Sequence, residues 1–233
     1  MKTVAIISGG MDSVTMLHKL VKEGKEVKAI SFNYGQIHVK ELDMAKWQCE
    51  HLGIDHKIVD VRFLKDLLPS ALTGTKEVPH GHYEDETMKQ TVVPFRNTIL
   101  ASIALGYASG LEYDEIALGV HSGDHAIYPD CRPEFFEALS VVARLGDYRA
   151  IGIYVPYMNL TKVEILAEGL NILTVDYSKT WTSYSDGEEP DYKTGSSVER
   201  TQAFIMNHAI DPLYRDKETW EKAKEYATTV KAQ

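Results

Sequence analysis

The fold is decided by residues 4–13, which read VAIISGGMDS. The first four residues are an apolar run, which is typical of a strand buried on both faces of a sheet, and a turn with two glycines follows at once. The next residues show helical spacing, with apolar positions at Val14, Leu17 and Val21 and polar positions at Thr15, His18, Lys19 and Lys22. The stretch therefore predicts a strand, a glycine turn and a helix.

The alternation of strands and helices continues along the chain. We expect further strands at residues 27–32, 58–61, 116–120 and 151–155, and helices at residues 42–52, 99–108, 135–145, 161–170, 198–208 and 217–230. This order predicts an open parallel sheet with helices on both faces. Residues 1–175 are expected to form this α/β domain, and residues 176–233 a C-terminal loop and helices packed on it.

Details within these elements can also be predicted. The helix at 135–145 is expected to bury Phe135, Leu139, Val142 and Leu145. Two polar stretches, residues 72–90 and 183–197, are expected to be surface loops, and the first of them could act as a lid. His80 and His82, which lie in the first loop, are expected to face solvent.

Composition narrows the class of protein. The chain of 233 residues fits one α/β domain, and its 34 acidic and 25 basic residues give a net charge of -9. Sequence-independent binding of nucleic acid needs the opposite charge balance. Two cysteines make no disulfide framework, and the N-terminus lacks a signal-peptide pattern, so we expect a cytoplasmic protein. No apolar run approaches the roughly 20 residues that span a bilayer, so we expect no membrane insertion.

The turn at residues 8–13 (SGGMDS) lies where parallel sheets bind ligands, between the carboxyl end of a strand and the N-terminus of a helix. Its two glycines allow the backbone to approach an anion, and its two serines add hydroxyl donors. The alternative is a plain turn in which Asp12 or Ser13 caps the helix. The spacing matches neither the GxxxxGK pattern of P-loops nor the GxGxxG pattern of dinucleotide folds.

The SGGxDS pattern resembles the signature of the PP-loop ATP pyrophosphatases, which cleave ATP to AMP and pyrophosphate and adenylate a substrate oxygen. The resemblance implies that Asp12 helps to hold Mg²⁺ and that Lys162 is the lysine that neutralises the α-phosphate. A lysine in the first turn of a helix opposes the helix dipole, so its position calls for an anionic partner. The residues of the turn implied to bind ATP are Ser8, Gly9, Gly10, Met11, Asp12 and Ser13.

Further blocks resemble the 7-cyano-7-deazaguanine synthase family of the queuosine pathway, in the same order: FNYGQIH (32–38) with Glu41-Leu42, VPFRN (93–97), GVHSGD (119–124) and YPDCRP (128–133). Members of this family convert 7-carboxy-7-deazaguanine, ammonia and ATP to the nitrile. An acyl adenylate forms first, ammonia gives the amide, and a second activation removes the amide oxygen. The resemblance also implies a homodimer, with the helices from Val198 onward as contact surface. No glutamine amidotransferase segment is visible, so ammonia is expected to come from solution.

The same blocks imply the remaining site residues. Arg96 is expected to be catalytic with Asp12 and Lys162, because its planar guanidinium matches the two oxygens of a carboxylate or phosphate. The alternative is an arginine bonded to loop carbonyls. Asp130 is expected to accept from the guanine-like N–H pair while Arg132 faces the carboxylate or the adenylate, and the alternative is a salt bridge between these near neighbours. The implied ATP contacts are Phe32, Gln36, His38 and Gly119, and the implied substrate contacts are Phe95, Arg96, Asn97, His121, Asp124, Asp130 and Arg132.

Several of these residue types have a plainer interpretation. Phe32 and Phe95 could be walls of the site or ordinary core residues. The spacing of His121, Asp124 and His125 could bind a metal, but a hydrogen-bonded polar loop is favoured. No base stands beside Cys131 in the sequence, and Cys49 lies on the apolar face of its helix, so both cysteines are expected to be non-catalytic.

One segment departs from the family. The resemblance implies a zinc site of four cysteines between Thr180-Trp181 and Glu199-Arg200, but its positions hold Ser183, Asp191, Thr194 and Ser197. Neutral hydroxyls are poor zinc ligands, so we expect no zinc. Packing of Trp181, Tyr184 and Tyr192, or a partner subunit, must then order residues 183–197. The product could be the nitrile, the amide, or an adduct with a different acceptor.

Two other classes of protein compete with this interpretation. The first is a PP-loop enzyme that modifies tRNA, either a thiolase or a lysidine-type ligase. Thiolases generally need paired cysteines and the ligases a basic tRNA face, and a net charge of -9 with two scattered cysteines fits neither. The second is a non-catalytic nucleotide sensor that kept the ATP pocket.

Overall fold

The computed structural model describes residues 1–36, 39–73, 79–183 and 188–230. Within these ranges one sheet has the strand order β3-β2-β1-β4-β5, and every neighbouring pair is parallel. The predicted open parallel sheet is therefore confirmed. Its strands are β1 (Lys2–Ile6), β2 (Glu26–Asn33), β3 (Asp55–Asp60), β4 (Glu115–Ala117) and β5 (Gly152–Tyr154).

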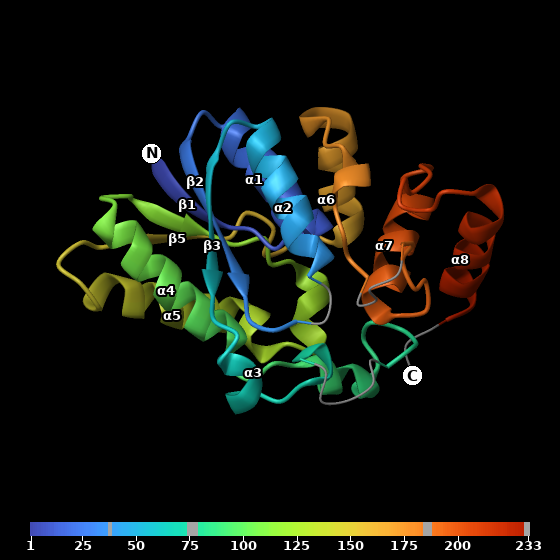
Figure 1. Ribbon diagram of the computed structural model, residues 1–233, viewed down its shortest axis with the longest axis horizontal. Coiled ribbons are helices and arrows are strands. Elements are labelled where there is room, and N and C mark those ends of the chain that lie inside the picture. Colours follow the sequence, from blue (N-terminus) through green and yellow to red (C-terminus); the bar gives the residue numbers. More distant parts are fainter. Residues whose placement is uncertain (37–38, 74–78, 184–187, 231–233) are drawn as a thin grey trace.

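Helices cover both faces of the sheet, as predicted. Figure 1 shows α1, α2 and α6 on one face and α4 and α5 on the other. The helices are α1 (Met11–Lys22), α2 (Lys40–His51), α3 (Leu64–Leu67), α4 (Arg96–Gly110), α5 (Pro133–Leu145), α6 (Lys162–Glu168), α7 (Gly195–Met206) and α8 (Lys217–Thr229).

The central strand β1 is buried on both faces. Val4 and Ala5 are both fully buried, and they belong to apolar clusters on opposite sides of the sheet because neighbouring residues in a strand point in opposite directions. Ala5 lies between Ala29 of β2 and Ala117 of β4. Three small side chains in a row allow α1 to pack closely on this face, which fixes the turn between β1 and α1.

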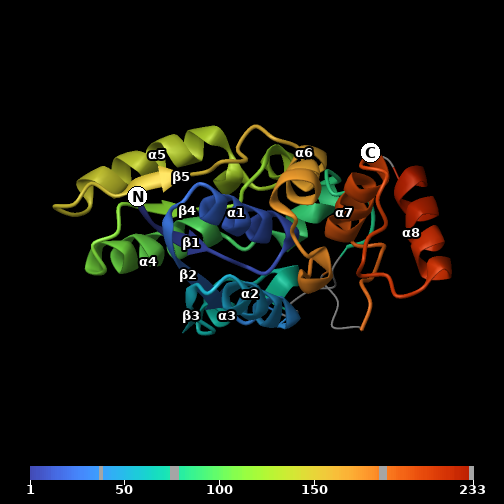
Figure 2. The same cartoon turned by 90° about the horizontal axis from the view of Figure 1, so that it is seen from above.

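The C-terminal helices extend the core beyond the sheet. A third apolar cluster joins Met11 of α1 and Leu166 of α6 to Phe204 of α7 and Trp220 of α8. Figure 2 shows α7 next to α6, with α8 outside it. Apolar contacts thus cross the expected boundary between residues 175 and 176, and the division into two parts stays a prediction.

The polar side of α1 was predicted incorrectly at one position. Thr15 is fully buried, and its hydroxyl donates to the carbonyl of Met11 at 2.7 Å and lies 2.8 Å from the hydroxyl of Tyr177. Val21, by contrast, is 40% exposed. The reason is that α6 and the C-terminal cluster cover a second side of α1, which the spacing of apolar residues does not reveal.

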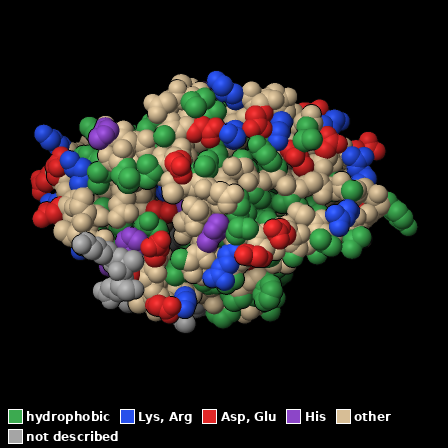
Figure 3. Space-filling view, turned by 180° about the vertical axis from the view of Figure 1, so that it is seen from behind, with side chains coloured by type: hydrophobic (Ala, Val, Ile, Leu, Met, Phe, Trp, Pro, Cys, Tyr) green, Lys and Arg blue, Asp and Glu red, His purple; other side chains and the backbone are tan. Residues whose placement is uncertain are grey.

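The expected buried face of α5 is also rotated. Phe136, Leu139 and Ala143 are buried, whereas Val142 and Leu145 are 57% and 75% exposed. Figure 3 shows hydrophobic side chains gathered at the end of the molecule where α5 lies. The sequence pattern contains apolar residues on both sides of this helix, so it could not show which side meets the sheet.

The two expected surface loops are partly folded and buried. Residues Glu86–Thr91 form a short 3-10 helix with Met88 and Thr91 buried, and α7 begins within the second loop, at Gly195. His82 is buried and stacks on Tyr83, contrary to expectation, whereas His80 is exposed. In the described ranges, no helix has the length and apolar character needed to cross a membrane.

Candidate active site

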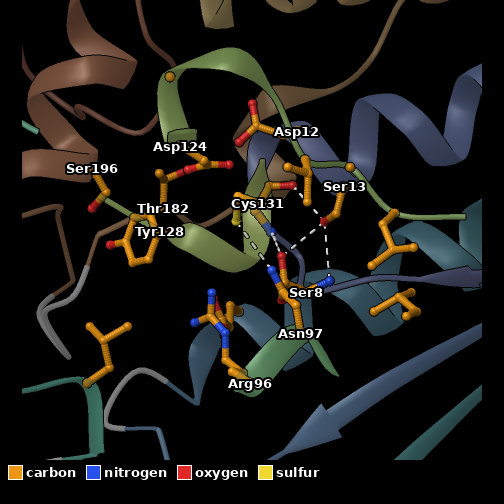
Figure 4. A pocket seen from close by; sticks show the side chains of 18 of the residues that line it. Ser8, Asp12, Ser13, Arg96, Asn97, Asp124, Tyr128, Cys131, Thr182 and Ser196 are labelled. Carbon is orange, nitrogen blue, oxygen red and sulfur yellow. Dashed lines mark hydrogen bonds between the residues drawn. The ribbon is translucent and has the colours of Figure 1, made fainter. Parts of the chain in front are cut away.

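A pocket of about 270 Å³ lies at the carboxyl ends of β1, β2 and β4. The turn after β1, the N-terminus of α4 and residues between Trp181 and Glu199 all contribute to its lining, so both ends of the chain build it. Figure 4 shows Asp12 and Asp124 toward one end of the pocket and Arg96 toward the other. This is the edge at which parallel sheets bind their ligands.

The turn after β1 is held by its own serines. Ser13 Oγ donates to the carbonyl of Gly10 at 3.1 Å and accepts from the N–H of Ser8 at 3.2 Å, while Ser8 Oγ accepts from the N–H of Gly10 at 3.1 Å. Gly10 is the N-cap of α1 and no side chain caps it, so the alternative in which Asp12 or Ser13 caps this helix does not hold. The first-turn N–H groups of α1 have no partners within the helix and can serve an anion.

Gly9 also has a structural role in the turn. Its φ is +94°, and a Cβ there would lie 1.9 Å from the carbonyl oxygen of Glu41 in α2. Its own carbonyl accepts from the N–H of Trp181 at 2.9 Å. Gly9 therefore joins the turn to α2 and to the C-terminal region, and only a glycine fits there.

A buried charge network surrounds Lys162. Its ammonium lies 2.6 Å from Glu199 and 3.3 Å from Asp12, and His121 lies 3.7 to 3.9 Å from Asp12, Asp124 and Glu199. Burial alone would lower the pKa of Lys162, but Asp12 and Glu199 raise it well above its usual range. Burial opposes ionisation of Asp12, yet Lys162 and His121 hold its pKa below the ordinary value. Lys162 is thus positive and Asp12 negative near neutral pH.

Asp12 has the properties of a metal ligand. Its Oδ2 faces Lys162, but its Oδ1 is buried and has no hydrogen-bond partner among the described residues. Mg²⁺ takes carboxylate oxygens and substrate phosphates as ligands. A carboxylate oxygen without a partner, beside an anion-binding turn, fits such an ion.

The opposite end of the pocket contains Arg96, Tyr34 and Glu41. The guanidinium carbon of Arg96 lies 5.9 Å from the centre of the Tyr34 ring. Burial raises the pKa of Glu41 to about 8, although Arg96 partly opposes the shift. Burial likewise raises the pKa of Tyr34, to about 12. Arg96 and Glu41 are half-buried, so Arg96 brings a positive charge to a partly enclosed end of the pocket.

Comparison with known proteins identifies the family. A model of the family described as "Queuosine biosynthesis protein QueC" matches residues 2–208. The chain belongs to the QueC family. The 7-cyano-7-deazaguanine synthase of Hahella chejuensis is 54% identical over 213 residues, which are 91% of this chain and 92% of that protein. The enzyme of the same name from Marinobacter nauticus is 51% identical over 211 residues, covering 90% of this chain and 95% of that one. The solved U34-tRNA thiolase NcsA from Methanococcus maripaludis is 19% identical, with a TM-score of 0.48 over 100% of this chain and 74% of its own.

This QueC chain brings many of the predicted site residues together in the pocket. They come from the turn after β1, from β2, from α4, from the loop after β4 and from α6. Those that line the pocket are Ser8, Gly10, Asp12, Ser13, Phe32, Arg96, Asn97, Gly119, Asp124 and Lys162.

Other predicted substrate contacts do not line the pocket. Phe95 is 73% exposed, because its positive φ of 54° at the N-cap of α4 turns it to solvent. Asp130 Oδ2 accepts from the N–H of Asn97 at 3.0 Å and so caps the start of α4. Arg132 donates to the carbonyl of His125 at 2.8 Å. His121 is 1% exposed and accepts from the N–H of Gly123, so it supports the loop behind the pocket.

Two predicted ATP contacts lie behind the pocket. Met11 is buried in the C-terminal apolar cluster. Gln36 accepts from the N–H of Tyr34 and donates to the carbonyl of Phe32, so it shapes the turn after β2. His38 lies outside the described residues.

Sequence reasoning missed several residues that line the pocket: Tyr34, Glu41, Tyr83, Trp181, Thr182 and Glu199. In the sequence, Glu199 stands out only as part of the frame around the zinc positions. The sequence does contain one signal for such a residue. Lys162 lies in the first turn of a helix, where its charge opposes the helix dipole, so an anionic group is expected close to it. Asp12 and Glu199 are such partners in this structure.

The four positions of the expected zinc cysteines lie close together in this QueC chain. Ser183 accepts from the N–H of Asp191 at 3.0 Å, and Thr194 donates to Ser197 at 3.0 Å and to the carbonyl of Asp191 at 3.2 Å. Ser183, Thr194 and Ser197 are each at most 2% exposed. Hydroxyl groups bonded to one another in this way do not fit a zinc ion. The aromatic packing expected around Tyr184 lies outside the described residues, but Tyr192 packs on Tyr226.

Chelation is expected to leave the melting temperature unchanged. If hydrogen bonds hold Ser183, Asp191, Thr194 and Ser197 together, then EDTA or a thiol-free zinc chelator has no structural metal to remove. The measurement is a thermal melt with and without chelator, together with the metal content of the purified protein. A stoichiometric zinc, or a lower melting temperature after chelation, would show that the altered site still binds metal.

Proposed function

We propose that this chain is a 7-cyano-7-deazaguanine synthase that uses ATP, Mg²⁺ and ammonia from solution. The observation that supports it most is that one pocket contains the anion-binding turn, the Asp12–Lys162 pair and Arg96. These groups are what an adenylation of a heterocyclic acid requires. The relatives in the QueC family are named for this product.

Each group of residues has a separate role in the adenylation. The first-turn N–H groups of α1 and the hydroxyls of Ser8 and Ser13 hold the phosphates that leave as pyrophosphate. Asp12 would hold Mg²⁺, which offsets the negative charge of those phosphates. Lys162 stabilises the charge that develops on the α-phosphate, and Arg96 orients the carboxylate of the substrate.

The chemistry then proceeds in two activations. A carboxylate oxygen of the substrate attacks the α-phosphorus of ATP, and pyrophosphate leaves. The nitrogen of ammonia attacks the acyl carbon, and AMP and one proton leave to give the amide. The amide oxygen then attacks the α-phosphorus of a second ATP, and pyrophosphate leaves. Loss of that oxygen with AMP, and of the two protons on nitrogen, gives the nitrile.

A specific observation keeps arrest at the amide as a second candidate. The hydroxyl cluster that occupies the zinc positions adjoins Gly195 and Ser196, which line the pocket. A change in this wall can affect the second activation without affecting the first. As in the family, we further propose a homodimer in the cytoplasm.

The test is a product analysis. Purified protein is incubated with 7-carboxy-7-deazaguanine, ATP, Mg²⁺ and ammonium, and acid, amide and nitrile are separated by mass. We expect the nitrile, with two AMP released for each product. Accumulation of amide with one AMP would establish the second candidate. AMP release without the acid, or none at all, would contradict both, and retention of tRNA at moderate salt would favour a tRNA-modifying enzyme.

A further inference from the structure

The C-terminal region presents one carboxylate, Glu199, to the centre of the pocket. Glu199 lies near the start of α7, far in sequence from the turn after β1, and it lines the pocket. Its side chain is 11% exposed, and its Oε2 lies 2.6 Å from the ammonium of Lys162. That distance is shorter than the 3.3 Å from the same ammonium to Asp12. Lys162 therefore has its tightest contact with the C-terminal region.

The neighbouring residue holds Glu199 in place. Arg200 donates to both oxygens of Asp211 at 2.7 and 2.9 Å, and to the hydroxyls of Thr180 and Thr182 at 2.8 and 3.1 Å. It also donates to the carbonyl of Tyr177 at 3.2 Å. These bonds tie α7 to the segment that contacts the turn after β1. The position of Glu199 relative to Lys162 is thus fixed from the side away from the pocket.

The loop after β4 leaves space for this carboxylate. A Cβ on Gly123 would lie 2.4 Å from Glu199 Oε1, so a larger residue there would displace it. The other charged groups around Lys162 are Asp12 from α1 and His121 and Asp124 from the loop after β4. Of the three carboxylates, Asp12 is needed for the metal ion, and Asp124 is 30% exposed. Glu199 is the carboxylate that can stay with Lys162 while ATP and Mg²⁺ are bound.

We infer that Glu199 is a positioning residue for Lys162, and that the C-terminal region thereby takes part directly in the adenylation step. The carboxylate holds the ammonium at one place in the pocket. Lys162 can then meet the α-phosphate without first being reoriented, which is how a preorganised charge lowers a barrier. This inference rests on the proposed function, because it assigns a role within the same reaction.

The experiment measures exchange of labelled pyrophosphate into ATP, which reports the first activation and needs no ammonia. Glu199→Gln keeps the size of the side chain and removes its charge. We expect kcat for exchange to fall roughly 10- to 100-fold, with little change in the KM for ATP, because the contact matters most in the transition state. The matched control is Glu188→Gln, since Glu188 is an exposed carboxylate of the same region that pairs with Arg215.

A second variant distinguishes positioning from a structural role. Glu199→Asp keeps the charge but shortens the side chain, so it cannot keep the wild-type contact of 2.6 Å with Lys162 without a shift of the backbone. We expect it to recover part of the loss seen in Glu199→Gln, with kcat several-fold below the wild type and an unchanged KM for ATP. A merely structural role would instead lower the melting temperature of both variants and leave kcat of the folded protein unchanged.

Each outcome decides a separate question. Glu199→Gln with the kcat and the KM of Glu188→Gln would overturn the inference alone. If Glu199→Gln does not fold, wild-type kcat in Glu199→Asp would overturn it equally. If the unmodified protein shows no exchange that depends on 7-carboxy-7-deazaguanine, the proposed function fails and this inference fails with it.

Discussion

Asp12→Asn is expected to lower pyrophosphate release by about 10³-fold or more while the protein stays folded. The change is nearly isosteric and removes the negative charge that would hold Mg²⁺ beside the phosphates, a contribution of several kcal/mol. Burial raises the pKa of Asp12, but the positive charges of Lys162 and His121 lower it by more, so that the pKa lies below its ordinary value. The wild-type carboxylate is therefore charged near neutral pH. The readout is AMP and pyrophosphate formed with saturating substrates.

The stability of this variant is part of the prediction. Lys162 keeps its shorter contact with Glu199, so it is not left as a buried charge without a partner. Thermal unfolding should therefore change little, and Asp12→Ala should likewise lose AMP formation without loss of soluble protein. Asp43→Asn, an exposed carboxylate of α2, is the control. Loss of folding in the Asp12 variants would mean that this residue stabilises the fold and would count against its assignment to the metal.

Arg200→Leu is expected to lower the free energy of unfolding by about 3–5 kcal/mol, because Asp211 would remain as a buried charge without its partner. Arg200 and Asp211 are 2% and 0% exposed. For a chain of this size, each kcal/mol changes the melting temperature by about 2–4 °C, so the expected decrease is roughly 6–20 °C. Thermal melts at one protein concentration measure it.

An exposed ion pair of the same region provides the comparison. Arg215 lies 2.7 Å from Glu188, but the two side chains are 66% and 83% exposed. Arg215→Leu should therefore cost about 0–1 kcal/mol. The double variant Arg200→Leu/Asp211→Leu should lose less than the sum of its single changes, because no charge is then left unpaired. Equal decreases for Arg200→Leu and Arg215→Leu would show that the buried pair has no special role.

The sheet could be predicted from the sequence because its signals are local. The run at residues 4–7, the glycines after it and the helical spacing beyond it lie next to one another in the chain. The burial of Thr15 could not be predicted, since it depends on Tyr177, which is distant in sequence. The rotated face of α5 was missed because apolar residues occur on both sides of that helix.

The candidate site, too, could be predicted from the sequence only where its signals are local. The turn after β1 and Lys162 could be recognised from their motifs, and they line the pocket. The roles expected for Asp130 and Arg132 stay predictions, because in this structure the two side chains bond to the N-terminus of α4 and to a loop carbonyl and do not line the pocket. Glu199 joins Lys162 only through the packing of α7 on α6. No spacing within one segment could show that contact.

The hydrogen bond from Trp181 to Gly9 has a consequence for biosynthesis of the protein. The ribosome synthesises the turn after β1, which contains Gly9, near the start of the chain. It synthesises Trp181 much later, and α7 later still. A nascent chain that has completed only the sheet lacks the wall of the pocket that Trp181, Thr182 and Glu199 form. The complete pocket therefore arises late in translation, after the sheet strands have emerged.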